Sequence, residues 1–372
     1  MNGVMATESI QMQFKDYIRT LPPYKPPKLT RQQPAGVVKL SSNENPLGPS
    51  PRALAAMQAA LAGAHRYPDA GAVALRQGLA ERFDMPPEQI ICTNGSDEMV
   101  LLLCLAFLGV GDEAVMAEGT FISYYRRTLE MGARAVRVPL RNYTHDLEAL
   151  ADAVTPRTRL LFVCNPNNPT GTSNGAAEVA RLLDRVPEDV LVVLDEAYIE
   201  FVERPDFPDS LAELRAGRRN LIALRTFAKI HGLAGLRLGY AFAHPDVVDY
   251  LERARPTFNV NLLAQVGGLA ALSDDAHLER SRAHARASRA YMTAALRALG
   301  LDPLPSETNF VAVVVGDDAA VTEALMERGF TVNPLAGWGL PGMIRVSFGL
   351  EDENRRFIAA LREVLGELRV GA

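Results

Sequence analysis

The stretch Thr226–Tyr240, which reads TFAKIHGLAGLRLGY, has residues suited to covalent chemistry with amines. Lys229 lies among glycine, alanine and leucine residues, where an ammonium group is poorly hydrated and its pKa falls towards nucleophilic use. Arg237, eight residues later, is a planar cation suited to phosphate, and the intervening glycines allow a close approach to a ligand. A lone lysine is usually a solvated loop residue. With these neighbours, Lys229 instead predicts a Schiff base with pyridoxal phosphate (PLP).

Two polar motifs follow apolar runs and supply groups for a pyridine ring. The segment Asn165–Gly171 contains three asparagines and two prolines, and the Asn168 amide is a donor for a phenolic oxygen. Asp195 ends the next apolar run, where its carboxylate would be costly to bury without a cation such as a protonated pyridine nitrogen. Tyr198 follows within reach of the ring hydroxyl. We expect the Asn168–Pro169 bond to be cis, because the Asn168 amide must face the ring while the chain reverses.

Residues upstream of these motifs complete a candidate cofactor site. The segment Thr93–Glu98 follows a predicted strand and opens a predicted helix, so free amides at Ser96 and Asp97 would hold a phosphate at the positive helix end. Such residues are also ordinary helix caps, and the segment taken alone favours that alternative. Phe121, after the next predicted strand, offers a ring to stack on a pyridine.

A parallel α/β sheet would bring these motifs together. From Glu88 onward, predicted strands alternate with predicted helices. Ligands of such sheets bind at the carboxyl ends of the strands, where the motifs lie. The predicted strands are residues 90–93, 113–117, 135–139, 159–164, 190–195, 221–225 and 237–243. The predicted helices are residues 97–108, 121–131, 147–154, 176–185 and 246–255.

The remaining segments predict an N-terminal arm and a second, smaller domain. The expected division is 1–50 for an extended, proline-rich arm and the start of the small domain, 51–265 for the large PLP-binding domain, and 266–372 for an interdomain helix and the C-terminal small domain. The long helical stretch after residue 261 is expected to break at Gly267 and Gly268 and again near Asp274.

The C-terminal segment reads as a small α+β unit with one conspicuous arginine. The expected elements are a strand at 309–315, a helix at 319–327, a short segment at 330–333, a strand at 343–348 and a helix at 352–368. Arg345 lies inside the second of these strands. It either pairs with a surface carboxylate or clamps a substrate carboxylate or phosphate, and the sequence favours neither alternative.

Composition and charge exclude several classes of function. The 372 residues carry a net charge of −5, so no overall positive field attracts nucleic acid or an anionic membrane. The longest apolar run, Met99–Val110, is too short to span a bilayer, and we expect a soluble, cytoplasmic protein. The histidines lack metal-ligand spacing and the three cysteines lie among apolar residues, so no metal is expected.

Four motifs in a fixed order carry a family resemblance. They are NPTG from Asn168, DEAY from Asp195, TFAK from Thr226 and GLRLGY from Gly235. Together they resemble the histidinol-phosphate aminotransferase family of the fold-type-I PLP transaminases, from about Tyr24 to the C-terminus. The resemblance implies an α/β fold of type I, with a large, mostly parallel seven-stranded sheet domain plus a small α+β domain.

The resemblance also implies roles for residues at matching positions. Lys229 would be the Schiff-base lysine and proton carrier, Asp195 the partner of the pyridinium, and Phe121 the stacking ring. Asn168 and Tyr198 would contact the ring oxygen. The resemblance implies a phosphate-binding site made of Ser96, Asp97, Thr226 and Arg237 and completed by Tyr67 of the partner subunit. The residues implied for the substrate side are Tyr24, Asn45, Asn333 and Arg345.

The implied activity is that of a transaminase of amino-acid biosynthesis. It would move an amino group from histidinol phosphate or an L-amino acid, such as an aromatic one, to 2-oxoglutarate. The mechanism would be ping-pong Schiff-base chemistry in a homodimer with shared active sites. A PLP-dependent decarboxylase or lyase on the same scaffold is the alternative. A PLP-sensing regulator would need a nucleic-acid-binding domain, for which the arm is too short.

The chain departs from the family pattern at three positions. Ala228 replaces a common serine before the lysine, and Gly119 replaces a common proline. At Asn333 the family usually has an arginine that helps to hold the substrate phosphate. With Arg345 as the remaining arginine, an ordinary L-amino acid should compete well with histidinol phosphate, unless a basic residue of the arm supplies the missing charge.

Overall fold

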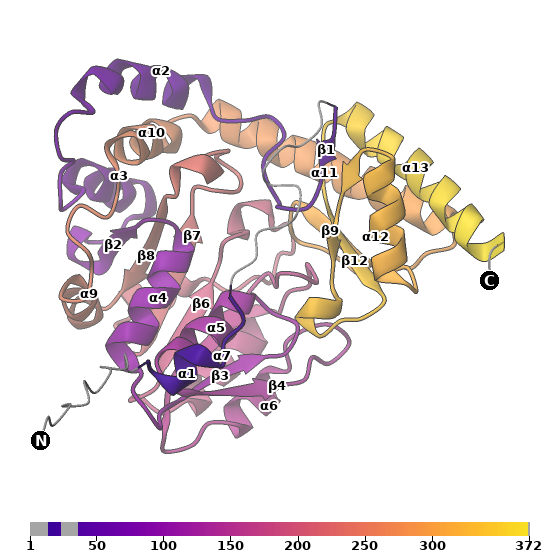
Figure 1. Cartoon of the computed structure of the whole chain (residues 1–372). Coiled ribbons are helices and arrows are strands. Elements are labelled where there is room, and N and C mark those ends of the chain that lie inside the picture. Colours follow the sequence, from indigo (N-terminus) through magenta and orange to yellow (C-terminus); the bar gives the residue numbers. More distant parts are fainter. Residues whose placement is uncertain (1–13, 24–35, 371–372) are drawn as a thin grey trace, which may run out of the picture.

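The computed structural model describes residues 14–23 and 36–370, which form a large α/β unit and a smaller unit beside it (Figure 1). A seven-stranded sheet lies at the centre of the large unit. Its order is β2 (Ile90–Thr93), β8 (Gly239–Ala243), β7 (Leu221–Thr226), β6 (Leu191–Asp195), β5 (Thr158–Cys164), β3 (Glu113–Ala117) and β4 (Arg134–Val138). All strands are parallel except β8, which runs antiparallel to both neighbours. The predicted sheet is thereby confirmed.

Helices cover both faces of this sheet, because successive side chains of a strand point to opposite faces. On one face, Leu161 and Val163 of β5 belong to a core covered by α3 (Val73–Phe83), α6 (Leu147–Asp152), α7 (Ala176–Arg185), α8 (Ser210–Arg215) and α10 (Leu262–Leu272). On the other face, Leu160 and Phe162 join a core covered by α4 (Ser96–Phe107), α5 (Ile122–Glu130) and α9 (Pro245–Glu252).

The smaller unit combines segments from both ends of the chain. Its antiparallel sheet has the order β11 (Asn333–Pro334), β12 (Met343–Ser347) and β9 (Phe310–Val314), and β1 (Val38–Lys39) pairs in parallel with β10 (Phe330–Thr331). A separate core lies against α12 (Asp318–Glu327), α13 (Glu351–Val370) and the end of α11 (Asp275–Ala298). The loop after β1 touches both units, since Asn43 bonds to Ser347 of β12 and to Tyr198. We retain the domain division at residues 50 and 265 as a proposal.

Two local expectations are wrong. Gly267 and Gly268 do not break α10, because they allow close packing: a Cβ on Gly268 would lie 2.4 Å from Leu238 Cδ2. Tertiary contact therefore overrides the low helix propensity of glycine. The expected break near Asp274 is confirmed, since α10 ends before it and α11 begins after it. The arm is not wholly extended, because α1 (Asp16–Arg19) forms one helical turn within its described part.

The helix α2 (Pro51–Ala60) begins at Ser50, whose hydroxyl accepts a hydrogen bond from Ala53 N, and it packs against α10. Among the residues that the structure describes, no helix has the length and apolar character needed to cross a bilayer.

Candidate active site

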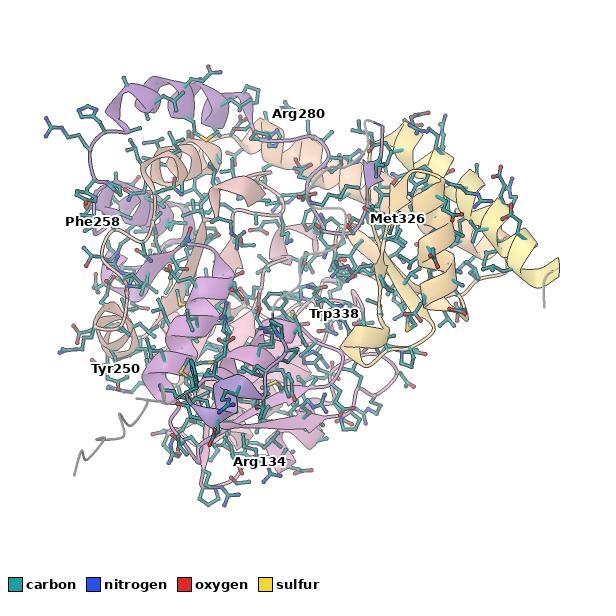
Figure 2. The ribbon with its side chains drawn as sticks, in the orientation of Figure 1. Arg134, Tyr250, Phe258, Arg280, Met326 and Trp338 are labelled. Carbon is teal, nitrogen blue, oxygen red and sulfur yellow. The ribbon has the colours of Figure 1, made fainter. Side chains whose placement is uncertain are left out.

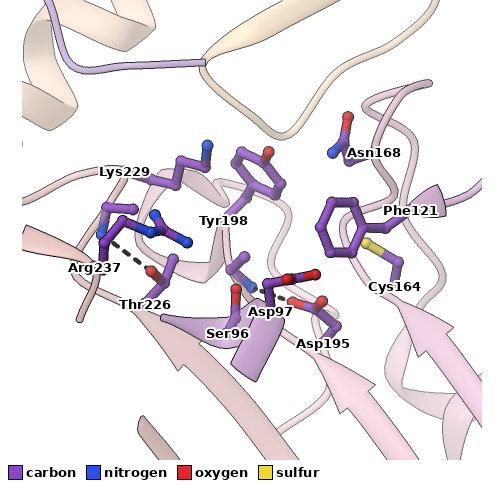
Figure 3. Close-up of a pocket in the computed structure, with 12 residues that line it drawn as sticks. Ser96, Asp97, Phe121, Cys164, Asn168, Asp195, Tyr198, Thr226, Lys229 and Arg237 are labelled. Carbon is purple, nitrogen blue, oxygen red and sulfur yellow. Dashed lines mark hydrogen bonds between the residues drawn. The ribbon is translucent and has the colours of Figure 1, made fainter. Parts of the chain in front are cut away.

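A cavity of about 130 Å³ lies at the carboxyl ends of three strands, where β5, β6 and β7 end at Cys164, Asp195 and Thr226 (Figure 3). Its lining residues are Ser96, Asp97, Phe121, Cys164, Asn168, Asp195, Ala197, Tyr198, Thr226, Ala228, Lys229 and Arg237. The structure thus brings together every predicted catalytic and cofactor-binding residue except Tyr67. The reason is topological, since a parallel sheet collects its loops at one edge.

Lys229 lies in the loop after β7 with its ammonium group inside the cavity. Its Nζ donates to the Ser42 carbonyl oxygen at 3.2 Å and lies 5.7 Å from the centre of the Tyr198 ring. Burial, and after it the positive charge of Arg345, lowers the pKa of Lys229 to about 8. A tight turn positions this loop. Gly232 has a φ of +68°, and a Cβ there would lie 2.2 Å from the Gly48 carbonyl oxygen.

The start of α4 and Arg237 form a candidate anion site at one end of the cavity. Arg237 forms no ion pair with any residue that the structure describes, so its charge is available to a ligand. Two glycines allow the close approach: a Cβ on Gly239 would lie 2.6 Å from Ser96 N, and one on Gly95 would lie 2.7 Å from Arg237 Nη2. The Asp97 carboxylate accepts from Arg127 at 2.7 Å. Its charge is thereby neutralised, while the helix N-terminus remains favourable for phosphate.

Asp195 also lines the cavity and is almost fully buried. Its carboxylate accepts hydrogen bonds from the Tyr124 hydroxyl at 2.5 Å and from Ala197 N at 3.1 Å. Burial raises the pKa of Asp195, because no cationic side chain within the described residues contacts it and desolvation disfavours the charged form. Tyr124 was not among the residues predicted for the site. Its spacing of three residues from Phe121, at the start of a helix, is a signal that would have placed both rings on one face.

Asn168 and Tyr198 reach the cavity from different loops. The Tyr198 hydroxyl accepts from Asn43 Nδ2 at 2.9 Å, and Asn168 Oδ1 accepts from the Arg345 guanidinium. Asn45, in the loop after β1, was predicted to line the substrate side, but it is not among the residues that line this cavity. Its amide donates to the Ile230 carbonyl oxygen at 2.8 Å, which braces the lysine loop. Asn43 is the asparagine of that loop that contacts a lining residue.

The prediction of a cis bond at Asn168–Pro169 is wrong. The cis bond is Asn165–Pro166. The Asn165 side chain joins the two ends of this loop: it accepts a hydrogen bond from Asn174 N at 2.9 Å and donates one to the Asn174 carbonyl oxygen at 3.2 Å. The Asn168 amide therefore reaches the cavity without a cis bond of its own.

The predicted substrate residues have different surroundings. Arg345 is buried, and its guanidinium donates to the Ser41 carbonyl oxygen at 2.6 Å. No described carboxylate contacts it, so the alternative of a surface ion pair is wrong. Asn333 lies directly opposite Arg345 in the pairing of β11 with β12. Tyr67 is 81% exposed and stacks on Phe258 at 4.6 Å, away from the cavity of its own chain. Tyr24 lies outside the described residues.

The residues of the cavity fit PLP. The buried carboxylate of Asp195 lacks a cation, which a protonated ring nitrogen would supply. The guanidinium of Arg237 lacks an anion, which a phosphate would supply. Lys229 lines the same cavity as an amine with a lowered pKa. Together these residues would hold a cofactor that carries an aldehyde, an acidic phosphate group and a basic ring nitrogen.

Comparisons with known proteins agree with this chemistry. The family model for aminotransferase class I and II matches residues 35–361. A histidinol-phosphate aminotransferase of Moorella thermoacetica is 46% identical over 357 residues, which cover 94% of this chain and 92% of the relative. One from an Anaeromyxobacter species is 44% identical over 360 residues, with 94% and 98% covered. The crystal structure of histidinol-phosphate aminotransferase from Sinorhizobium meliloti in complex with pyridoxal-5'-phosphate superimposes with a TM-score of 0.89 at 30% identity, covering 97% of this chain and all of that one.

Proposed function

The chain belongs to the histidinol-phosphate aminotransferase family and is a PLP-dependent aminotransferase, and on this premise we propose that it transfers the amino group of histidinol phosphate or of an L-amino acid to 2-oxoglutarate. The main support for the proposal is that Lys229, Asp195 and Arg237 line the same cavity. The relatives are named aminotransferases, so the decarboxylase or lyase alternative is not favoured.

Each residue of the cavity has a distinct proposed task. PLP, when bound, supplies an aldehyde that combines with amines and a ring that accepts electrons. Lys229 would hold it covalently and, once released, would move a proton at its Nζ. Asp195 would keep the ring nitrogen protonated, with Tyr124 fixing the carboxylate through the 2.5 Å hydrogen bond. Arg237 and the start of α4 would anchor the phosphate.

The substrate side would be controlled by Arg345. A bidentate bond from its guanidinium to a carboxylate orients the substrate, while Asn168 holds the guanidinium in place. Exclusion of water by the surrounding buried residues strengthens these electrostatic interactions.

We also propose a homodimer in which the two chains share their active sites. Tyr67 supports this arrangement, because its ring is exposed and lies away from the cavity of its own chain. Symmetric dimers are the commonest soluble oligomers.

The test is a panel of amino donors with 2-oxoglutarate, combined with borohydride reduction of the holoenzyme and peptide mapping. We expect the pyridoxyl group on Lys229 and formation of glutamate from histidinol phosphate or an L-amino acid. A pyridoxyl group on another lysine, or release of carbon dioxide without glutamate, would contradict the proposal.

A further inference from the structure

Asn167 directly precedes Asn168 but is not among the residues that line the first cavity, the candidate active site. Its side chain is buried and takes part in four hydrogen bonds, which use the full capacity of an amide. The Nδ2 group donates to the Gly119 carbonyl oxygen at 3.0 Å and to Thr170 Oγ1 at 2.8 Å. A carbonyl oxygen only accepts, so the contact with Gly119 fixes the orientation of the amide.

This orientation also assigns the proton of a buried histidine. Asn167 Oδ1 accepts from Thr120 Oγ1 at 2.8 Å and lies 3.0 Å from His145 Nε2. Since Oδ1 can only accept, His145 Nε2 carries a proton. Burial lowers the pKa of His145 to about 4, so the ring is neutral at neutral pH and its Nδ1 atom is unprotonated. His145 is therefore a fixed donor to Asn167.

These hydrogen bonds join two loops that carry lining residues. Gly119 and Thr120 precede Phe121 in the loop after β3, and Asn167 precedes Asn168 in the loop after β5. Phe121 and Asn168 both line the first cavity. Each of them is one residue away from a residue of the hydrogen-bond network, so a shift of either loop would move a lining side chain.

Glycine at position 119 makes this connection more important. The φ of Gly119 is +61°, which is closed to proline because its ring fixes φ at about −65°. Glycine also leaves the backbone freer than any other residue. A second cavity, of about 60 Å³, separates this loop from Trp338, at the edge of the smaller unit that faces the large sheet (Figure 2). The hydrogen bond from Asn167 therefore supplies a restraint on the side where the loop meets the large unit.

We propose that Asn167 is a positioning residue that holds Phe121 and Asn168 in one fixed arrangement around the cofactor. This inference rests on the proposed function and on the expected roles of the two residues, stacking on the ring and contact with the ring oxygen. Asn168 Oδ1 accepts from Arg345, which leaves Asn168 Nδ2 as the donor for that oxygen. A fully satisfied buried amide specifies one arrangement, so both loops are in place before PLP binds.

The first test is a pH titration of the visible absorbance of the holoenzyme, for the wild type, Asn167→Ala, Asn168→Ala and the double variant. A donor to the ring oxygen stabilises its negative charge, so loss of the donor raises the midpoint. Asn168→Ala should raise the midpoint by about one pH unit, the effect of one hydrogen bond to a charged group. Asn167→Ala should give part of this shift, and the double variant should match Asn168→Ala, because Asn167 acts through Asn168. An unchanged midpoint for Asn167→Ala, or additive shifts, would overturn the proposal.

The second test is amide hydrogen exchange of the holoenzyme, measured by mass spectrometry. Asn167→Ala should accelerate exchange about tenfold in the loops at 118–121 and 166–173, because both lose hydrogen bonds. His145→Gln keeps an N–H donor and should exchange more slowly in these loops than His145→Leu. Wild-type exchange of both loops in Asn167→Ala would overturn the proposal.

Asn220→Ala is the matched control for both tests. Asn220 is also a buried asparagine whose Nδ2 donates twice, to the Pro187 and Val190 carbonyl oxygens at 3.2 Å, but it lies just before β7, at the opposite end of the sheet. This variant should lower the Tm and leave the midpoint and the two loops unchanged. The same changes in Asn220→Ala as in Asn167→Ala would show a general loss of stability and overturn the proposal.

Failure of the proposed function gives a different result. If no amino donor is turned over, the proposed activity fails, while both tests still apply because they need only bound PLP. If Asn168→Ala leaves the midpoint unchanged, the expected contact of Asn168 with the ring oxygen fails, and the exchange of the two loops alone decides the role of Asn167.

Discussion

Replacing Arg345 with glutamine should weaken the use of amino-acid donors without destabilising the fold. Within the described residues, the buried guanidinium donates hydrogen bonds only to neutral oxygens, those of Asn168 and Ser41, and its Nε has no partner. Burial lowers the pKa of Arg345 to about 10. At about 1.4 kcal/mol for each pH unit, keeping this side chain charged costs the folded state about 3 kcal/mol. The cost is typical of a functional site rather than of a stabilising ion pair.

A substrate carboxylate would offset this cost by binding the free edge of the guanidinium. Removing one partner of a buried charge pair costs about 2–5 kcal/mol, which corresponds to a fall in kcat/KM of about 30-fold to several thousandfold. The fall should come mainly from KM, because the carboxylate keeps its charge from the ground state to the transition state.

The assay is transamination from L-histidine or L-phenylalanine to 2-oxoglutarate, with thermal unfolding measured on the same preparations. The Tm of Arg345→Gln should equal or exceed that of the wild type. Arg225→Gln is the control, because Arg225 is buried and bonds to the buried Glu196 at 2.9 Å. Loss of Arg225 leaves an unpaired carboxylate and should lower the Tm. A Tm for Arg345→Gln as low as that of the control would show that Arg345 stabilises the fold, and an unchanged kcat/KM would show that it does not bind the donor carboxylate.

Three further predictions concern the cofactor and the dimer. The rate at which the apoenzyme captures PLP, measured by stopped-flow absorbance, should rise with pH through about 8 and then level off. The reason is that burial lowers the pKa of Lys229 to about 8 and only its free amine reacts with the aldehyde. A midpoint of this pH profile near 10 would contradict the prediction. Gly239→Ala should raise the Kd of PLP at least about tenfold, because the new Cβ would meet Ser96 N. The control Gly235→Ala places its Cβ in open space and should leave the Kd unchanged. Equal changes in Kd for the two variants would show that the close approach of Gly239 to Ser96 does not matter for PLP binding. Mixed dimers of Lys229→Ala and Tyr67→Ala chains should regain activity that neither homodimer has, and a fully active monomer in sedimentation would exclude shared sites.

Most residues that line the first cavity could be predicted from the sequence, because each is marked by a local pattern. Asp195 and Thr226 end buried apolar strands, and Asn168 lies in a turn that directly follows another. The end of such a strand is visible in the sequence, since an apolar run stops where a polar motif begins. The rule that ligands bind at the carboxyl ends of parallel strands then places these residues in one cavity without further information.

The hydrogen-bond partners of these residues could not be predicted from the sequence, because they come from distant parts of the chain. Tyr124 is 71 residues from Asp195, and Asn43 is 155 residues from Tyr198, yet each pair is joined by a hydrogen bond. No local pattern records such pairs, because the interaction exists only after packing has buried both groups and removed water as the competing partner.

Packing also determined where local propensity fails. The glycines of α10 favour a break by about 1 kcal/mol each, but the helix continues because it lies so close to Leu238 that no Cβ fits at Gly268. Likewise, a strand pattern alone left two alternatives for Arg345, an ion pair with a surface carboxylate or a clamp on a substrate carboxylate or phosphate. The smaller unit buries it against the loop after β1 and beside Asn168, and an arginine held there without a carboxylate is available to an acidic substrate.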